Sequence, residues 1–212
     1  MHSQKPPLVV LFTRPGGGKG TQLKALQKEY DSSVFGTGEY IRNNVPNNSE
    51  LAEFFSKSRG ATLLPDRLIL PPTVRWLEAK KDNPSIKILD GVPRNISQCQ
   101  LFEFAQSFGM SKRIIVHIDV PELVCNDRIL ERAKLDPSRS HELDPEVRGN
   151  RFREHDKETA PVLEFVVKQG LARVYSIHTD GLEDPDRITF QIRTILGQEG
   201  ILPNRIRNLV AA

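Results

Sequence analysis

A lysine set among glycines, between a short apolar segment and a helical pattern, is the part of this sequence best suited to bind an anion. Residues 13–22 read Thr-Arg-Pro-Gly-Gly-Gly-Lys-Gly-Thr-Gln and follow five apolar residues, Leu8 to Phe12. Glycines let successive backbone N–H groups turn toward a ligand, because no Cβ stands in the way. A helix N-terminus adds a partial positive charge, and Lys19 adds a full one. The segment therefore predicts a loop that binds a polyphosphate.

The residues around this loop predict a strand before it and a helix after it. Five apolar residues without polar alternation are typical of a strand buried on both faces of a parallel sheet. After the loop, Leu23, Leu26 and Tyr30 recur at helical spacing, and the helix is expected to end near Tyr30. Four further strands are expected at residues 34–35, 86–90, 113–119 and 172–178. The pattern predicts a doubly wound α/β domain with five parallel strands.

Composition narrows the class of protein. The chain has 212 residues, 38% of them hydrophobic, and a net charge of +3, which is too small to indicate nucleic-acid binding. Its two cysteines, Cys99 and Cys125, have no metal-binding spacing and suggest no disulfide framework. The apolar run near the N-terminus is too short for a signal peptide or a membrane span. We therefore expect a cytoplasmic protein without nucleic-acid or membrane partners.

Two motifs carry a resemblance to the adenylate kinase family of nucleoside monophosphate kinases. The first is Pro-Gly-Gly-Gly-Lys-Gly-Thr-Gln at 15–22, and the second is Asp-Gly-Val-Pro-Arg at 90–94, similar to the family's Asp-Gly-Phe-Pro-Arg. Thr13 departs from the general phosphate-loop pattern, which has Gly at this place. The resemblance extends over residues 8–197. It implies a P-loop, three-layer αβα fold with a five-stranded parallel sheet.

The resemblance also implies a division of the chain. A single P-loop kinase domain, 1–212, would have its core in 8–36, 66–132 and 148–197, a small monophosphate-binding lobe in 37–65, and a lid in 133–147. The lid is of the short form, without a zinc site formed directly by the protein. The tail, 198–212, has no assigned role. Within the core, Pro71-Pro72 predicts a kink or a restart in the helix that begins at Asp66.

An ATP site and a metal site follow from the same resemblance. Arg128 and Arg132, four residues apart on one helix face, would lie against the base of ATP and on its phosphates. Asp90, at the end of a strand beside the loop, would hold Mg²⁺ through water, since Mg²⁺ dehydrates reluctantly. The residues expected to bind ATP are Pro15, Gly16, Gly17, Gly18, Lys19, Gly20, Thr21 and Arg128.

A second nucleotide site is implied for AMP. Gln98 would recognise the adenine, and the arginines would hold phosphate oxygens, which suits their planar, two-pronged donors. The residues expected to bind AMP are Thr37, Arg42, Leu64, Gly91, Arg94, Gln98, Arg139 and Arg151. Phosphoryl transfer depends mainly on positioning and charge neutralisation. The residues expected to be catalytic are Lys19, Arg94, Arg132, Arg139 and Arg151.

The expected reaction is ATP + AMP ⇌ 2 ADP, catalysed by a monomer with Mg²⁺ as cofactor. Two alternatives stay open. Asn95, directly after Arg94, is found in several UMP/CMP kinases. Thr13 and the lid pair His141-Glu142, where the family has two aspartates, would suit a nucleotide-binding protein with weak catalysis.

Overall fold

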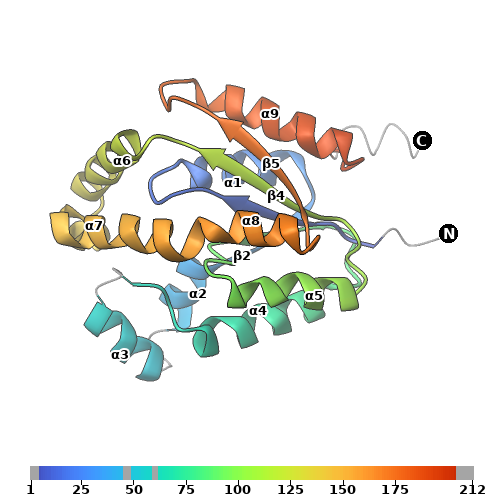
Figure 1. The fold of residues 1–212 in the computed structure, drawn as a ribbon, viewed down its shortest axis with the longest axis horizontal. Coiled ribbons are helices and arrows are strands. Elements are labelled where there is room, and N and C mark those ends of the chain that lie inside the picture. The colour runs from blue at the N-terminus through green and yellow to red at the C-terminus, as the bar shows by residue number, and fades with distance from the viewer. Residues whose placement is uncertain (1–4, 45–48, 59–61, 204–212) are drawn as a thin grey trace.

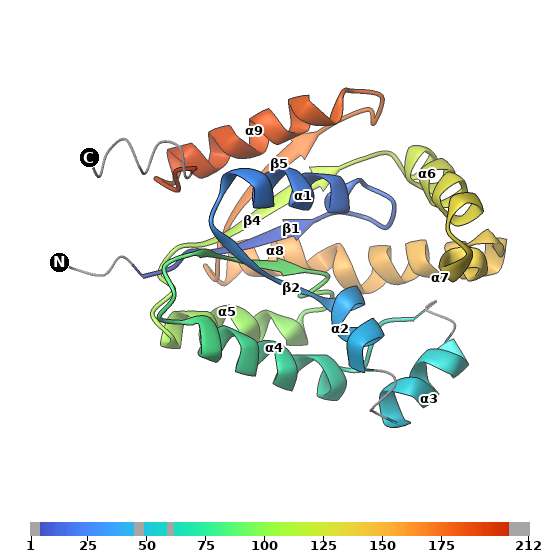
Figure 2. The same cartoon turned by 180° about the vertical axis from the view of Figure 1, so that it is seen from behind.

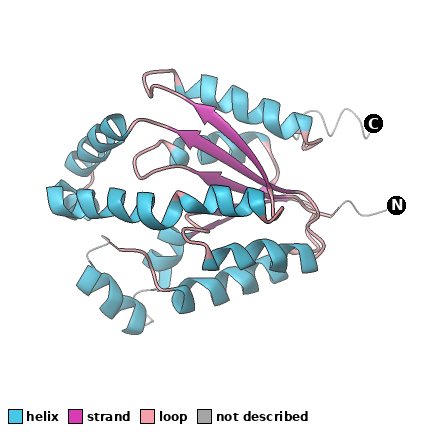
Figure 3. Ribbon diagram, in the orientation of Figure 1, coloured by secondary structure: helices cyan, strands magenta, loops and turns pink. Residues whose placement is uncertain are grey.

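A five-stranded parallel sheet forms the centre of the molecule, which is described by a computed structural model at residues 5–44, 49–58 and 62–203 (Figures 1 and 3). The strand order is β2-β3-β1-β4-β5. β1 lies in the middle and pairs with β3 and β4. The strands are β1 (Leu8–Phe12), β2 (Ser32–Gly36), β3 (Ile86–Asp90), β4 (Arg113–Asp119) and β5 (Arg173–His178).

Helices cover both faces of the sheet (Figures 1 and 2). They are α1 (Lys19–Glu29), α2 (Thr37–Asn44), α3 (Ser49–Ser58), α4 (Asp66–Lys80), α5 (Gln100–Ser107), α6 (Glu122–Leu135), α7 (Pro145–Glu154), α8 (Pro161–Lys168) and α9 (Pro185–Gln198). A 3₁₀ helix, Pro137–Leu143, lies between α6 and α7, and a π-helical turn, His155–Thr159, joins α7 to α8. None of the helices in the described ranges is long and apolar enough to cross a membrane.

Alternate residues of β1 belong to two separate cores, because successive side chains of a strand point to opposite faces. Leu8, Val10 and Phe12 pack with α4, α5 and α8. Val9 and Leu11 pack with α1, α6 and α9. All five residues are buried, which confirms the expected strand with two covered faces. The three-layer αβα fold predicted from the sequence is thereby confirmed.

Most element boundaries follow the sequence signals. α1 begins at Lys19 and is followed by Tyr30 as its C-cap, and α9 begins at Pro185 with the Asp184 carboxylate as its N-cap. A kink or a restart is expected from the sequence at Pro71-Pro72. The restart is wrong, since α4 runs unbroken from Asp66 to Lys80, and the kink stays a prediction. The two prolines lack the N–H groups that would bond to carbonyls one turn earlier, but packing of the buried face of α4 holds the helix together.

A buried lysine, Lys87, lies at the amino end of β3. The glycine loop lies at the opposite end of the strands, after the carboxyl end of β1. The Lys87 ammonium donates to the backbone oxygens of Asn83 and Ser85, at 2.9 and 2.6 Å, and to the Ser85 hydroxyl at 2.7 Å. The side chain is wholly buried. Burial lowers the Lys87 pKa to about 8, although the Asp31 carboxylate opposes the shift.

This lysine makes the stability of the fold depend on pH. An unfolded chain binds a proton at Lys87 up to a higher pH than the folded chain, so folding is favoured increasingly between pH 8 and 10.5. We expect the unfolding free energy of the wild type, relative to Lys87→Met, to rise by roughly 1–3 kcal/mol across this window. Urea unfolding at pH 7.5 and 10.5 measures this, with the exposed Lys28→Met as control. A difference that does not change with pH would contradict it.

Candidate functional site

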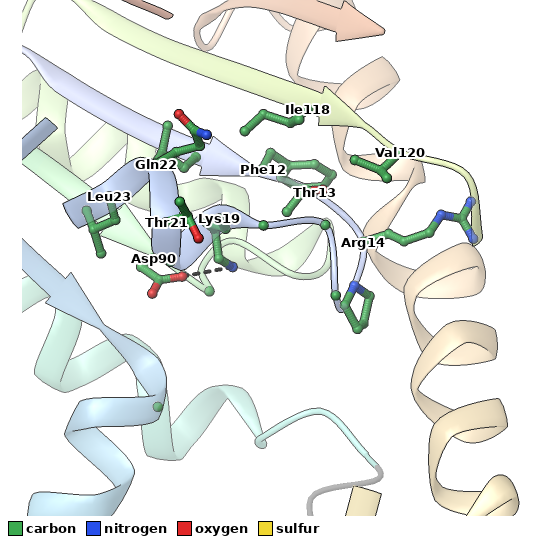
Figure 4. A pocket seen from close by; sticks show the side chains of 18 of the residues that line it. Phe12, Thr13, Arg14, Lys19, Thr21, Gln22, Leu23, Asp90, Ile118 and Val120 are labelled. Carbon is green, nitrogen blue, oxygen red and sulfur yellow. Dashed lines mark ion pairs between the residues drawn. The ribbon is translucent and has the colours of Figure 1, made fainter. Parts of the chain in front are cut away.

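A cleft of about 980 Å³ opens at the carboxyl ends of β1 and β3, beside the glycine loop (Figure 4). Its lining comes from elements far apart in the sequence: the loop after β1, the end of β3, the start of α2, helices α6 and α7, and the segment between β5 and α9. In a parallel sheet, strands that end at the same edge bring their following loops together. The sheet thereby gathers residues that no local pattern connects.

The glycine loop folds as a tight turn against α6. The Gly17 N–H donates to the Arg14 carbonyl at 3.0 Å, so the turn closes although Thr13 replaces glycine. A Cβ at Gly17 would lie 2.0 Å from the Thr13 hydroxyl, and one at Gly16 would lie 2.3 Å from the Cys125 carbonyl oxygen. Both positions therefore require glycine, since the loop is held close to its own start and to the first turn of α6.

Lys19 and Asp90 face each other across the floor of the cleft. Their Nζ and Oδ1 atoms are 2.8 Å apart, as the dashed line in Figure 4 marks. Burial lowers the Lys19 pKa, the Asp90 carboxylate opposes this, and the Arg94 guanidinium adds to the lowering. Burial and the neighbouring Arg151 also lower the pKa of Arg94. Several positively charged side chains thus lie close together in one partly buried space. A bound anion would reduce the repulsion among them.

Glu142 gathers the arginines at the lid side of the cleft. Its side chain is 2% exposed, and its Oε2 accepts from Arg132 at 2.7 Å while Oε1 accepts from Arg151. Arg139 lies 3.7 Å from the same carboxylate. Burial raises the Glu142 pKa, but the Arg151 charge and the Arg132 hydrogen bond outweigh it, so the pKa is lowered.

Sequence reasoning missed this role of Glu142. From the sequence, the lid pair His141-Glu142 is only a departure from the family's two aspartates. The structure shows that the glutamate keeps a carboxylate among three arginines. The available signal was the acid three residues after Arg139, at the family's own spacing, with one carbon more in its side chain.

The ATP-side residues named from the sequence all line the cleft. They are Pro15, Gly16, Gly17, Gly18, Lys19, Gly20, Thr21 and Arg128. The Arg128 guanidinium donates to the Gly181 carbonyl at 2.5 Å, which fixes it beside the segment between β5 and α9. Besides Lys19, the residues named for catalysis or AMP that lie in the lining are Arg42, Gly91, Arg94, Arg132, Arg139 and Arg151.

Three residues named for AMP are not part of this lining. Thr37, Leu64 and Gln98 are 6%, 9% and 2% exposed. The Thr37 hydroxyl has no hydrogen-bond partner within the described ranges. Leu64 packs into the core shared by α4 and α5. The structure therefore leaves these side chains behind the cleft surface.

The Gln98 amide is fixed by a polar network. Its Oε1 accepts from the Arg94 N–H at 2.7 Å, and its Nε2 donates to Asp66 at 2.8 Å. Asn95 accepts from the Gln98 N–H at 2.9 Å and donates to Asp66 at 3.0 Å. Asn95 is thus occupied in capping the helical turn that follows it. An amide has two donors and two lone pairs, so among the residues that the structure describes each end of Gln98 makes one of its two possible hydrogen bonds.

Asp90 fits a role in holding Mg²⁺ through water. It lies at the end of β3, 27% exposed, with one oxygen on Lys19 and the other toward Gly36. A search of the described ranges finds no three His, Cys, Asp or Glu side chains grouped to hold a metal. Mg²⁺ usually takes one or two carboxylates and completes its shell with water and phosphate oxygens, so a single acid here is compatible with it.

Comparison with known proteins identifies one family. The sequence model of the adenylate kinase family matches residues 11–171. An adenylate kinase of Flavobacterium johnsoniae is 28% identical over 195 residues, covering 89% of this chain and 97% of the relative. One of Thermobifida fusca is 34% identical, covering 77% and 86%, and one of a Cyanothece species is 30% identical, covering 90% and 95%.

The buried carboxylate in the lid yields a stability prediction. Glu142→Gln leaves the guanidinium groups of Arg132 and Arg151 without their counter-charge, so we expect a loss of about 2–3 kcal/mol at pH 7. Because the folded pKa of Glu142 is lowered, its contribution is complete above the ordinary value of 4.5 and is lost as pH falls through the folded pKa. Urea unfolding at pH 7 and at decreasing pH below 4.5 measures both effects. The exposed Glu146→Gln is the control, and equal stability of the two variants at pH 7 would contradict the prediction.

Proposed function

Because this chain belongs to the adenylate kinase family, its reaction is reversible phosphoryl transfer from ATP to AMP, giving two ADP, and we propose that both nucleotides bind in the cleft beside Lys19. The observation that carries the proposal is the convergence of cations on one space. Lys19, Arg94 and Arg151 come from three separate segments, and all line the cleft. Two phosphate chains placed end to end would supply the negative charge that this space lacks.

We assign ATP to the glycine loop and α6. Backbone N–H groups at the start of α1, together with Lys19, would bind the phosphates, and Arg128 would lie against the base. Arg132 would bind ATP phosphates from the next turn of α6. The Lys19 ammonium, now paired with Asp90, would exchange part of that contact for phosphate oxygens.

We assign the acceptor AMP to the opposite side of the cleft. Arg42 and Arg94 would bind its phosphate, with Gly91 close to both the Arg94 guanidinium and the Thr37 hydroxyl. Thr37 and Leu64 are proposed to border the nucleotide from behind this surface. Arg139 and Arg151 would neutralise charge on the phosphoryl group as it passes between the nucleotides.

Mg²⁺ would be held through water by Asp90, beside Thr21, and would neutralise charge on the phosphates of ATP. The chain's own residues do the positioning. We propose that residues 37–65 act as a monophosphate lobe and 133–147 as a lid, around a core of 8–36, 66–132 and 148–197. Exclusion of water by the lid would prevent hydrolysis of ATP. A monomeric state and a cytoplasmic location stay predictions. The tail, 198–212, keeps no assigned role, and its residues 204–212 lie outside the described ranges.

The alternatives have less support. Asn95 suggested a UMP/CMP kinase, but its side chain is occupied by Gln98 and Asp66. Thr13 and the lid acids suggested weak catalysis, yet the loop turn closes and Glu142 holds the arginines. The curated relatives are named adenylate kinase.

Removal of the loop lysine tests the proposed site. Lys19→Met removes the charge without opening a cavity in either core, so we expect ADP formation from ATP and AMP to fall at least a hundredfold while the protein stays folded. A coupled assay measures the rate, and circular dichroism checks the fold. Lys28→Met, a change at an exposed residue of α1 that does not line the cleft, is the control. A folded Lys19→Met protein with the wild-type rate would refute the site.

Base recognition gives a second test. We propose that Gln98 reads the adenine of AMP, its orientation set by Asp66 and the Arg94 N–H. The wild type should then prefer AMP to CMP and UMP, and Gln98→Ala should lower that preference about tenfold, because an unpaired base edge costs roughly 1–3 kcal/mol. The measurement is kcat/KM for each monophosphate. An equal loss for all three would mean that Gln98 acts only through Arg94.

A further inference from the structure

Arg14 is the one residue of the glycine loop with a long side chain directed away from the cleft floor. Figure 4 shows its guanidinium extending away from Lys19 and Asp90 toward the segment after Val120. It stands in the turn closed by the bond from the Gly17 N–H to the Arg14 carbonyl. Contacts that hold the Arg14 side chain therefore also restrain the loop that leads to Lys19.

The Arg14 guanidinium joins two acids from different elements. Its Nη1 lies 2.8 Å from Glu122 Oε2, at the start of α6, and 3.2 Å from Asp156 Oδ1, in the π-helical turn. The same Asp156 oxygen lies 3.2 Å from His155 Nδ1, and the His155 ring packs on Phe12, the last residue of β1. Arg14 thus links the glycine loop to the start of α6 and to the π-helical turn. The contact of His155 with Phe12 links the same turn to the end of β1.

The helices joined in this way carry three of the arginines that line the cleft. α6 bears Arg128 and Arg132, and α7, which leads into the π-helical turn, bears Arg151. The turn also reaches the monophosphate side, since Thr159 donates to the Arg94 carbonyl at 2.8 Å. Such π-helical turns are uncommon and occur frequently at functional sites.

These ion pairs are too exposed to add much to the stability of the fold, but they can still align the glycine loop with the helices of the cleft. The side chains of Arg14, Glu122 and Asp156 are 24%, 50% and 51% exposed, and ion pairs this exposed contribute little to the stability of a fold. Catalysis is far more sensitive, because a displacement of about 1 Å in a positioned group can cost on the order of a hundredfold in rate. A weak but directional contact can therefore matter for transfer without mattering for folding.

We propose that Arg14 is a positioning residue for phosphoryl transfer. Through Glu122 and Asp156 it holds the loop of Lys19 in register with the arginines of α6 and α7. Arg14 is among the residues that line the cleft, but its guanidinium is paired with the two acids, so in this proposal it acts on the loop and not on the nucleotide. The inference rests on the proposed function of the cleft and adds a residue that the family's phosphate-loop pattern does not specify.

The test is a double-mutant cycle in the ADP-forming assay. Arg14→Gln and Asp156→Asn should each lower kcat about tenfold and leave the KM for ATP within about twofold of the wild type. The double variant should lose no more than Arg14→Gln alone, because the ion pair that Asp156→Asn breaks is one of the two that Arg14→Gln has already removed. Arg14→Lys should recover part of kcat, since an ammonium keeps the charge but lacks the planar fork. Each variant should melt within about 3 °C of the wild type.

Arg193→Gln is the matched control, because Arg193 also pairs with an acid of another helix, Glu29 of α1, away from the cleft. It should leave kcat unchanged. A raised KM for ATP with unchanged kcat in Arg14→Gln would make Arg14 a nucleotide ligand and overturn the proposal, as would additive losses in the double variant. Failure of the proposed function is a separate result, since the wild type would then form no ADP and Lys19→Met would change nothing.

Discussion

Repulsion among cations is the constraint on which the arrangement of this cleft depends. Lys19, Arg94, Arg132, Arg139 and Arg151 all line one cleft. Two carboxylates offset the repulsion: Asp90 pairs with Lys19, and Glu142 contacts the arginines of the lid side. The acids keep the cations ordered, and the remaining excess of positive charge favours phosphate. The charges that the two acids keep in place are therefore the same charges that favour phosphate binding.

The rigid parts of the fold explain how these charges are held. The glycine loop contacts the first turn of α6 at Gly16 and closes its own turn at Gly17, where a side chain would collide. β1, buried on both faces, anchors the start of the loop. Polar networks complete the support, with Gln98 and Asp66 fixing the Arg94 segment and Arg14 linking the loop to two helices. The position of the glycine loop therefore depends on close backbone contacts, and the positions of the charged side chains depend on hydrogen bonds and ion pairs.

The sequence by itself determined the architecture and the phosphate loop, because both depend on local signals. The apolar run at Leu8–Phe12, the glycines and Lys19 predict strand, loop and helix wherever they occur. The cap at Asp184 lies where its residue type favours one, and α1 has its C-cap at Tyr30, directly before the polar residues Asp31 and Ser32. The one clear failure, the restart expected at Pro71-Pro72, came from a local rule that packing of α4 overrides.

Tertiary structure alone decided which charged groups meet. Glu142 and Arg151 are nine residues apart, Gln98 and Asp66 thirty-two, and Arg14 and Asp156 are in distant segments, so no periodic pattern could pair them. The inward position of Gln98 and the capping role of Asn95 likewise depend on what lies opposite each side chain. Hydrogen bonds and ion pairs act over a few ångströms in space, whereas sequence patterns describe neighbours along the chain.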